Sequence, residues 1–182
     1  MDQVTLTAAW MTFNVALSII PIIAVRLFIK SKSKPVKLAS GLIWFFFLPN
    51  TVYLITDIIN LSTDIHIIRG IYLLANAAIY LMLIPVGIAT YILAVYPFED
   101  NLPKKSRFVT LFFLNVCVGF GLVLGRIQRA NSWEVLTDVN LVIAKSVEIL
   151  RSYELIALVL VFAVFCQLIY FNFKKRVVKK FT

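Results

Sequence analysis

The chain has 182 residues, of which 61% are hydrophobic and only 15% are charged. Ordinary soluble domains are about 45 to 50% apolar and about 25% charged, so this composition excludes a soluble globular protein and predicts one surrounded by lipid. The formal net charge of +9 does not indicate nucleic acid, because the basic residues border long apolar runs, as topology signals and contacts with anionic lipid do. We expect one integral membrane domain over residues 1–182, with the lipid bilayer as a partner and no nucleic acid.

Five apolar segments are long enough to cross a bilayer, since a helix rises about 1.5 Å per residue and a hydrocarbon core of about 30 Å needs about 20 residues. The first segment follows Asp2 instead of a basic stretch and has no A-x-A cleavage site, so we interpret it as a retained helix and not a signal peptide. The predicted fold is all-α, a polytopic membrane helical bundle of about five transmembrane helices. Their approximate ranges are residues 6–29, 38–60, 70–96, 108–125 and 153–173.

Residues 133–151, between the fourth and fifth spans, carry too many charges to cross the membrane. Apolar residues recur there at near-helical spacing, with charged residues opposite them. This pattern predicts an amphipathic helix, either lying at the membrane interface or only covering the bundle. Asn131 or Ser132 is placed to cap its start.

The distribution of basic residues predicts the orientation, because Lys and Arg are retained on the cytoplasmic side during insertion. Thirteen of the 18 Lys and Arg fall on one side of the predicted spans, and seven of the nine acids fall on the other. We therefore expect an outside N-terminus and a cytoplasmic C-terminus. The thirteen are Arg26, Lys30, Lys32, Lys34, Lys37, Lys104, Lys105, Arg107, Lys174, Lys175, Arg176, Lys179 and Lys180.

Polar residues collect in the outer half of the predicted bundle. Those of the second span are spaced 3, 4, 3 and 4 residues apart and so share one helical face: Asn50, Tyr53, Asp57, Asn60 and Asp64. Other spans contribute Asn14, Asn76 and Asn115. Because an unsatisfied amide in hydrocarbon costs several kcal/mol, these side chains should face inward. They either line an outward-facing polar cavity or join the helices by hydrogen bonds.

Arg126 and Arg129 follow the fourth span on the same outer side. They are the expected partners of Asp57, since an acid near the membrane edge is less costly when paired with a guanidinium. Either the pair is purely structural, or the second arginine leaves bidentate donors for a phosphate or carboxylate. Gly121 and Gly125, in a GxxxG pattern just before, are typical of close helix packing.

Two segments resemble the signatures of domain-of-unknown-function family 1361, a family of uncharacterised bacterial integral membrane proteins. Residues 47–61 read FLPNTVYLITDIINL, and residues 125–134 read GRIQRANSWE; the family's motifs are similar to LPNAPYLxTDLxHL and GRxLRWNSWD. The matching residues are Leu48, Pro49, Asn50, Tyr53, Leu54, Thr56, Asp57, Leu61, Gly125, Arg126, Arg129, Asn131, Ser132 and Trp133. The departures are Thr51, Val52, Asn60, Ala130 and Glu134. The resemblance implies a bacterial cytoplasmic membrane protein and no particular activity.

These features predict binding of an anionic small molecule or lipid head group in the outward-facing cavity, as a transport-related component. The alternatives are an enzyme acting on envelope lipid, with Asp57 as acid or base, and a structural or assembly subunit with a membrane-protein partner. No nucleophile or cofactor motif is recognisable, and a single His66 beside scattered acids is typical of a solvated loop, so we expect no metal and no cofactor. The candidate binding residues are Asn50, Tyr53, Asp57, Arg126, Arg129, Asn131, Ser132 and Trp133.

Overall fold

The structure is a computed structural model that describes residues 3–61, 66, 69–130 and 134–181. Within these residues all regular elements are helical, which confirms the predicted all-α fold. The chain divides into two compact units, Met1–Val95 and Tyr96–Thr182, which are described one at a time.

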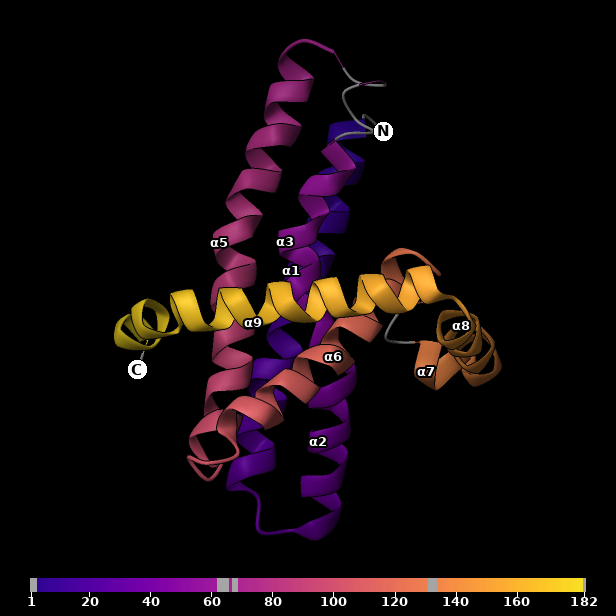
Figure 1. The fold of residues 1–182 in the computed structure, drawn as a ribbon. Helices are drawn as coiled ribbons and strands as arrows, with labels where there is room; N and C mark the ends of the chain where they lie inside the picture. Colours follow the sequence, from indigo (N-terminus) through magenta and orange to yellow (C-terminus); the bar gives the residue numbers. More distant parts are fainter. Residues whose placement is uncertain (1–2, 62–65, 67–68, 131–133, 182) are drawn as a thin grey trace. The chain divides into compact units, whose positions relative to one another are not determined.

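The first unit contains α1 (Gln3–Lys30), α2 (Lys34–Phe47), α3 (Pro49–Thr56), the 3₁₀-helix η1 (Asp57–Asn60) and most of α5 (Ile71–Asp100) (Figure 1). The second unit takes the last residues of α5, followed by α6 (Arg107–Arg126), α7 (Glu134–Thr137), α8 (Val139–Arg151) and α9 (Tyr153–Phe181).

Five helical segments are long and apolar enough to cross a membrane, and each overlaps one of the predicted spans: Thr7–Lys30, Lys34–Asn60, Ile71–Asp100, Arg107–Arg126 and Tyr153–Phe181. The protein is therefore a multi-pass membrane protein. The largest difference from the expected boundaries is at the C-terminus, where α9 continues to Phe181 instead of ending near residue 173. The added residues are mostly Lys, Arg and Val, and the lysines and arginine are good helix formers outside hydrocarbon.

The second span is not one continuous α-helix. Pro49 starts a new segment after Leu48, because proline has no N–H to donate to the preceding turn. The backbone then tightens to 3₁₀ geometry from Asp57 onward. Pro21, by contrast, lies within α1 without ending it. Irregular backbone within a span is tolerated where protein surrounds it, and seven of the eight residues of α3 are buried.

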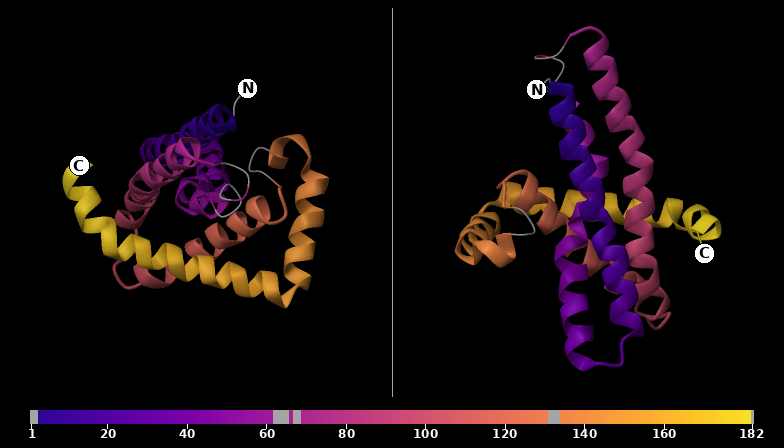
Figure 2. Two further views of the ribbon diagram at one scale, coloured as in Figure 1. Left: turned by 90° about the horizontal axis from the view of Figure 1, so that it is seen from above. Right: turned by 180° about the vertical axis from the view of Figure 1, so that it is seen from behind.

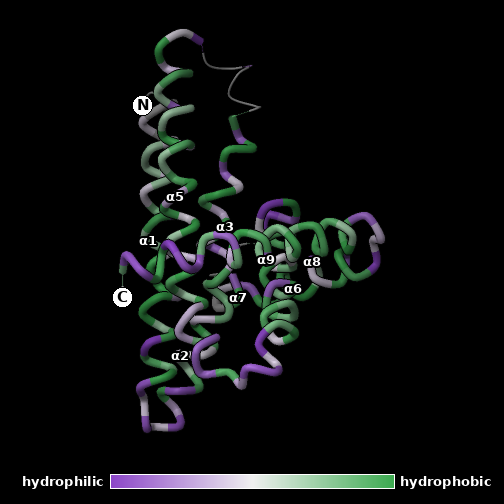
Figure 3. Tube along the Cα trace, turned by 60° about the vertical axis from the view of Figure 1, so that its left-hand side comes forward, coloured by the Kyte–Doolittle hydropathy of each residue, from purple (hydrophilic) through white to green (hydrophobic). Residues whose placement is uncertain are grey.

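In the first unit, α1 and α2 form an antiparallel pair joined by a short polar turn, and α5 runs beside α1 (Figures 2 and 3). The rings of Phe28 and Trp44 stack between the two paired helices, with centroids 6.3 Å apart. The Trp44 indole N–H also donates to the carbonyl of Ala94 at 2.9 Å, which joins α2 to α5. An indole N–H in a membrane needs such an acceptor, so this bond fixes the neighbouring helix.

Further along α5, Gly87 allows close contact with α3. A Cβ added at Gly87 would lie 2.6 Å from Cγ1 of Ile55 and 3.0 Å from the carbonyl oxygen of Thr51. Only glycine permits this approach of the two helices. Next to the contact, a buried cluster joins α1, α3 and α5: Met11, Leu54, Tyr80 and Leu83.

In the second unit, α6 packs along α9, and Gly119 lies at a close approach of the two helices. A Cβ at this position would overlap the carbonyl oxygen of Val159 and lie 3.1 Å from the amide nitrogen of Ala163. The GxxxG pattern predicted this role for Gly121 and Gly125 and not for Gly119. Ile149 of α8 is completely buried against Val123 and Val159, so α8 closes one end of the α6–α9 pair.

The predicted amphipathic helix over residues 133–151 is divided in two, as α7 and α8. Asp138 separates them, because its carboxylate accepts the backbone N–H of Leu141 at 3.0 Å and so caps the start of α8. The expectation of a single helix was wrong at this point. Its proposed caps, Asn131 and Ser132, lie outside the described residues.

The orientation is open to a labelling test in a background where Cys117 and Cys166 are replaced by alanine. The charge asymmetry predicts that cysteines introduced at Lys34 or Lys105 are protected from a membrane-impermeant thiol reagent in intact cells, whereas one at Asp64 is labelled. Asp64 lies outside the described residues and is chosen by its place in the sequence, between the second and third spans. The reverse pattern of labelling would invert the topology.

Gly119→Ala should destabilise the second unit by about 1 to 3 kcal/mol, since the methyl group collides with the backbone of α9 and not with a side chain that can move. Thermal unfolding in detergent measures the loss. Cys117→Ala is the matched control, as Cys117 lies on the same helix and is exposed. Equal melting temperatures for the two variants would show that the helices do not approach each other at Gly119.

Candidate functional site

Asp57 lies at the point where the second span changes from α to 3₁₀ geometry. Its side chain is buried, with only 4% of the residue exposed. The Nδ2 group of Asn14 donates to its Oδ2 at 3.2 Å, and Nδ2 of Asn60 donates to its Oδ1 at 3.5 Å. Because a carboxylate is costly in a membrane, these amide donors are part of what holds it there, and the bond from Asn14 ties α1 to η1.

Buried polar groups continue from Asp57 through the first unit. Asn50 and Asn76 are 5% and 0% exposed, and Thr51 and Thr56 are also buried. The threonine hydroxyls return to their own helix: Thr51 Oγ1 donates to the carbonyl of Leu48 at 2.8 Å. The two buried amides, by contrast, have hydrogen-bonding capacity toward other helices.

The second signature begins at the end of α6. Arg126 is the last residue of the helix and is half-buried, whereas Arg129 is exposed. The chain then turns back on the helix, since the N–H of Ala130 donates to the carbonyl of Leu124 at 3.0 Å. Within this turn Arg129 adopts a left-handed backbone conformation, with φ of 55°. Residues other than glycine seldom adopt it, and the cost is about 1 to 2 kcal/mol.

The predicted binding residues fall in both units, and three lie outside the described residues. Asn50, Tyr53 and Asp57 belong to the first unit, and Arg126 and Arg129 to the second. The expected ion pair between Asp57 and an arginine therefore stays a prediction, as does the outward-facing cavity. The remaining predicted residues, Asn131, Ser132 and Trp133, are those not described.

The structure accounts for other polar residues of the predicted spans and loops by helix packing or solvent exposure. Asn115 is buried as expected, but its Nδ2 donates to the side-chain oxygen of Gln167, so it joins α6 to α9 within the second unit. Such interhelical amide bonds are a common means of helix association in membranes. His66 is exposed. Among the described residues, no group of three or more His, Cys, Asp or Glu is arranged to hold a metal ion.

The family described as "Protein of unknown function (DUF1361)" matches over residues 13–169, which is most of the chain and includes both signature segments. The chain belongs to the DUF1361 family. No curated protein and no solved structure matches it.

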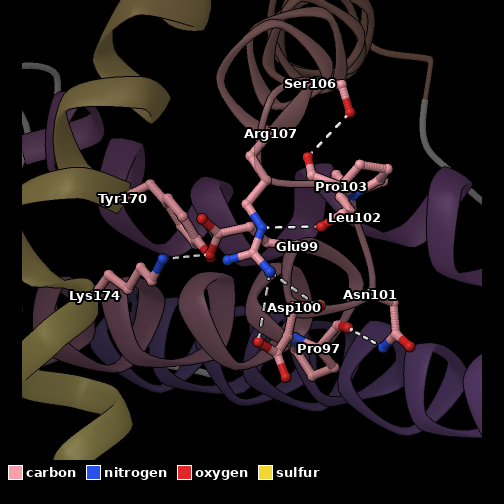
Figure 4. A network of polar contacts seen from close by, with 10 residues as sticks. All are labelled: Pro97, Glu99, Asp100, Asn101, Leu102, Pro103, Ser106, Arg107, Tyr170 and Lys174. Atoms are coloured by element: carbon pink, nitrogen blue, oxygen red, sulfur yellow. Dashed lines mark hydrogen bonds and ion pairs between the residues drawn. The ribbon is translucent and has the colours of Figure 1, made fainter.

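This DUF1361 protein has a second polar cluster, in the second unit, which was not predicted from the sequence (Figure 4). Glu99, near the end of α5, is 4% exposed. Its Oε2 accepts both the hydroxyl of Tyr170 at 2.7 Å and the ammonium of Lys174. The same ammonium lies 5.7 Å and 5.6 Å from the ring centroids of Tyr96 and Tyr170. A carboxylate and two aromatic faces thus surround Lys174.

Arg107 makes a neighbouring set of contacts, at the turn between α5 and α6. Its Nε donates to the carbonyl of Leu102 at 3.0 Å, and its Nη2 donates to the carbonyl of Asp100 at 3.1 Å. The same nitrogen is 3.9 Å from the carboxylate of Asp100. The cluster therefore fixes the α5–α6 turn and the end of α9 in this DUF1361 protein.

The sequence contained a partial signal for this cluster. Glu99 and Asp100 are the two acids on the side that carries thirteen basic residues, so pairing was to be expected. Tyr170 and Lys174 are four residues apart and therefore share a helical face. Choosing Lys174 among thirteen basic residues requires the packing of α5 against α9, which no pattern along the chain contains.

Replacing Glu99 alone should reduce the unfolding free energy more than replacing Glu99 and Lys174 together. Glu99→Gln leaves Lys174 partly buried without its carboxylate, and we expect a loss of about 1 to 3 kcal/mol in unfolding free energy. Adding Lys174→Met to the same protein should recover part of this loss, since the remaining groups are then neutral. Tyr170→Phe is the control that removes one hydrogen bond and no charge. Additive effects of the two substitutions, measured by thermal unfolding, would contradict the pairing.

Proposed function

We propose that this protein binds an anionic small molecule or the head group of an anionic lipid through Arg126 and Arg129, as a component of a transport system in a bacterial cytoplasmic membrane. The left-handed backbone of Arg129 is the observation that carries the proposal. Strained residues persist where the surrounding structure holds them, and they concentrate at binding and catalytic sites. Here the strained residue carries an exposed guanidinium, and it lies in the segment whose sequence resembles a signature of the family.

The chemistry of the two residues supports an anionic ligand. A guanidinium presents a planar fork of donors that fits the oxygens of phosphate or carboxylate. Arg126 and Arg129 are three residues apart across the end of α6, and the hydrogen bond from Ala130 back to the helix limits the freedom of the turn between them. Donors ordered in advance lower the entropic cost of binding.

Asp57 has a supporting role in this proposal. The charge distribution along the sequence predicts that it lies at the outer boundary of the second span, on the side where the fourth span ends. From this we predict that it orients one arginine while the other engages the ligand. The amides of Asn14 and Asn60 hold its carboxylate in a defined position for that role. Asn50, Tyr53, Asn131, Ser132 and Trp133 complete the proposed site.

A structural or assembly subunit is the second candidate, and a specific observation favours it. Two of the expected cavity-lining asparagines form hydrogen bonds between helices, from Asn14 to Asp57 and from Asn115 to Gln167. The outer polar groups then hold the bundle together and present it to a membrane-protein partner. An enzyme that uses Asp57 as acid or base is less favoured, because two amides already engage this carboxylate.

The arginines can be tested with defined anions. Purified protein in a neutral detergent is melted with increasing inorganic phosphate, acetate or glycerol 3-phosphate, a soluble analogue of a lipid head group. We expect one of these to raise the melting temperature, and Arg126→Ala and Arg129→Ala each to abolish the shift. The substitution at the arginine that does not pair with Asp57 should have little effect on the protein without ligand. Arg129→Lys tests the bidentate geometry, and Arg151→Ala, at an exposed residue of α8, is the matched control. A shift that survives both arginine substitutions would refute the site.

A double-mutant cycle separates the binding site from the structural candidate. If Asp57 pairs with an arginine, Asp57→Asn should destabilise the protein, and the arginine substitution should recover part of the loss. The expected coupling is about 0.5 to 3 kcal/mol by thermal unfolding. Additive losses with both Arg126→Ala and Arg129→Ala would show that Asp57 acts without either arginine.

A further inference from the structure

The Glu99 cluster leaves a surplus of positive charge at its end of the second unit. Its two acids, Glu99 and Asp100, are already engaged by Lys174 and Arg107. Six neighbouring basic residues have no ion pair with a described acid: Lys104, Lys105, Lys175, Arg176, Lys179 and Lys180. Lys and Arg side chains carry the same charge and cannot neutralise one another. These six cations are therefore available to an external anion.

Four of the six form one face of α9. At about 100° per residue, Lys175, Arg176, Lys179 and Lys180 fall within an arc of about 140°. All four are exposed, whereas Val177 and Val178, on the other side of the helix, are half-buried. The last two turns of α9 are therefore amphipathic, with their charges gathered on the open side. We refer to these four residues as the α9 basic face.

The length and composition of α9 predict that this face lies at the level of the phosphate groups of a bilayer. The helix has 29 residues, which at about 1.5 Å each exceeds the hydrocarbon core of about 30 Å by several residues. The excess is at the basic end, because the apolar run of α9 ends near Phe173. Phe171 and Phe181 are exposed on either side of the charges, and such apolar side chains can be buried just below the head groups while the charges reach the phosphates.

Contacts within the second unit also hold the face in place. Lys174 immediately precedes the face and is bound by Glu99 of α5, while Tyr170, one turn earlier, donates to the same carboxylate. Arg107 fixes the turn that carries Lys104 and Lys105. Lys174 and Arg107 are thus structural cations, and they hold the two segments that carry the unpaired ones.

We propose that the α9 basic face binds the phosphate groups of anionic phospholipids at the membrane surface, with Lys104 and Lys105 contributing to the same surface. Basic clusters that directly follow a membrane span are attracted to anionic leaflets, and the attraction decays within the screening length of about 8 Å. The proposal concerns other residues than Arg126 and Arg129 and does not depend on the proposed function.

Delipidated full-length protein in a neutral detergent provides the test. Its melting temperature is followed while phosphatidylglycerol or phosphatidylcholine is added, at low and at high salt. We expect phosphatidylglycerol to stabilise the protein at lower concentration than phosphatidylcholine, with the difference reduced by salt. Replacing the four residues of the α9 basic face by glutamine should raise the half-saturating concentration of phosphatidylglycerol about tenfold or more, and leave the melting temperature without lipid almost unchanged.

Two controls make the result specific. Glutamine at Arg26, Lys30, Lys32 and Lys34 removes the same number of exposed charges from the first unit and should change the half-saturating concentration much less. Arginine at Lys175, Lys179 and Lys180 preserves the charge and should preserve binding. The Arg126→Ala and Arg129→Ala variants should respond through this face like the unmodified protein, which separates it from the proposed outer site.

The proposal fails under any of three results. Equal stabilisation by the two lipids would show that the head-group charge is not recognised. Equal losses in the two four-residue variants would assign the effect to net charge and not to α9. Stabilisation of the Arg126→Ala and Arg129→Ala variants by inorganic phosphate, at the concentration where phosphatidylglycerol acts, would identify a site for free phosphate instead of a lipid surface.

Discussion

A polar group inside hydrocarbon has to find its hydrogen-bond partner within the protein, because no water is present to supply one. This constraint accounts for much of the polar structure of this membrane protein. Trp44 donates to the backbone of α5, Asn14 to Asp57, and Asn115 to Gln167. Each of these bonds joins two helices and so selects among the packings that apolar contacts alone would allow.

Interhelical hydrogen bonds also require that the backbones of neighbouring helices approach each other closely. Without a hydrophobic driving force between helices in lipid, association depends on van der Waals contact and on hydrogen bonds, both of which need short distances. Gly87 and Gly119 supply these distances, one in each unit, by removing the side chain at the point of approach. The Asn115–Gln167 bond lies one turn from Gly119, so a wider separation of α6 and α9 would weaken both interactions.

The five spans could be predicted from the sequence because an uninterrupted run of about 20 apolar residues matches the thickness of a bilayer and seldom occurs in soluble domains. Asp57 was likewise identified as a residue that needs partners, but Asn14 as one of those partners is apparent only from the packing of α1 beside η1. Glu99 shows the limit most clearly. Its pairing was foreseeable from charge, but the partner depends on the contact between the end of α5 and α9, which brings together Glu99 and Lys174, 75 residues apart in the sequence. The predicted helix over residues 133–151 is divided into α7 and α8 because the Asp138 carboxylate accepts a backbone N–H and starts a new helix. The periodicity of apolar residues does not reveal such a cap.

The same physics separates charges that maintain the fold from charges that are available to a ligand. A buried carboxylate such as Glu99 keeps its lysine near, because releasing it would leave an uncompensated charge in a low-dielectric region. Lys179 and Lys180 are exposed, so water solvates their charges when no anion is bound. A lipid phosphate can therefore replace water at these ammonium groups without leaving a buried charge uncompensated. Arg129 is intermediate: its side chain is exposed, but its backbone is held in the left-handed conformation, which is unfavourable for residues other than glycine. An exposed charge on a constrained backbone combines access to a ligand with a fixed direction, and a solvated surface residue has only the first of these.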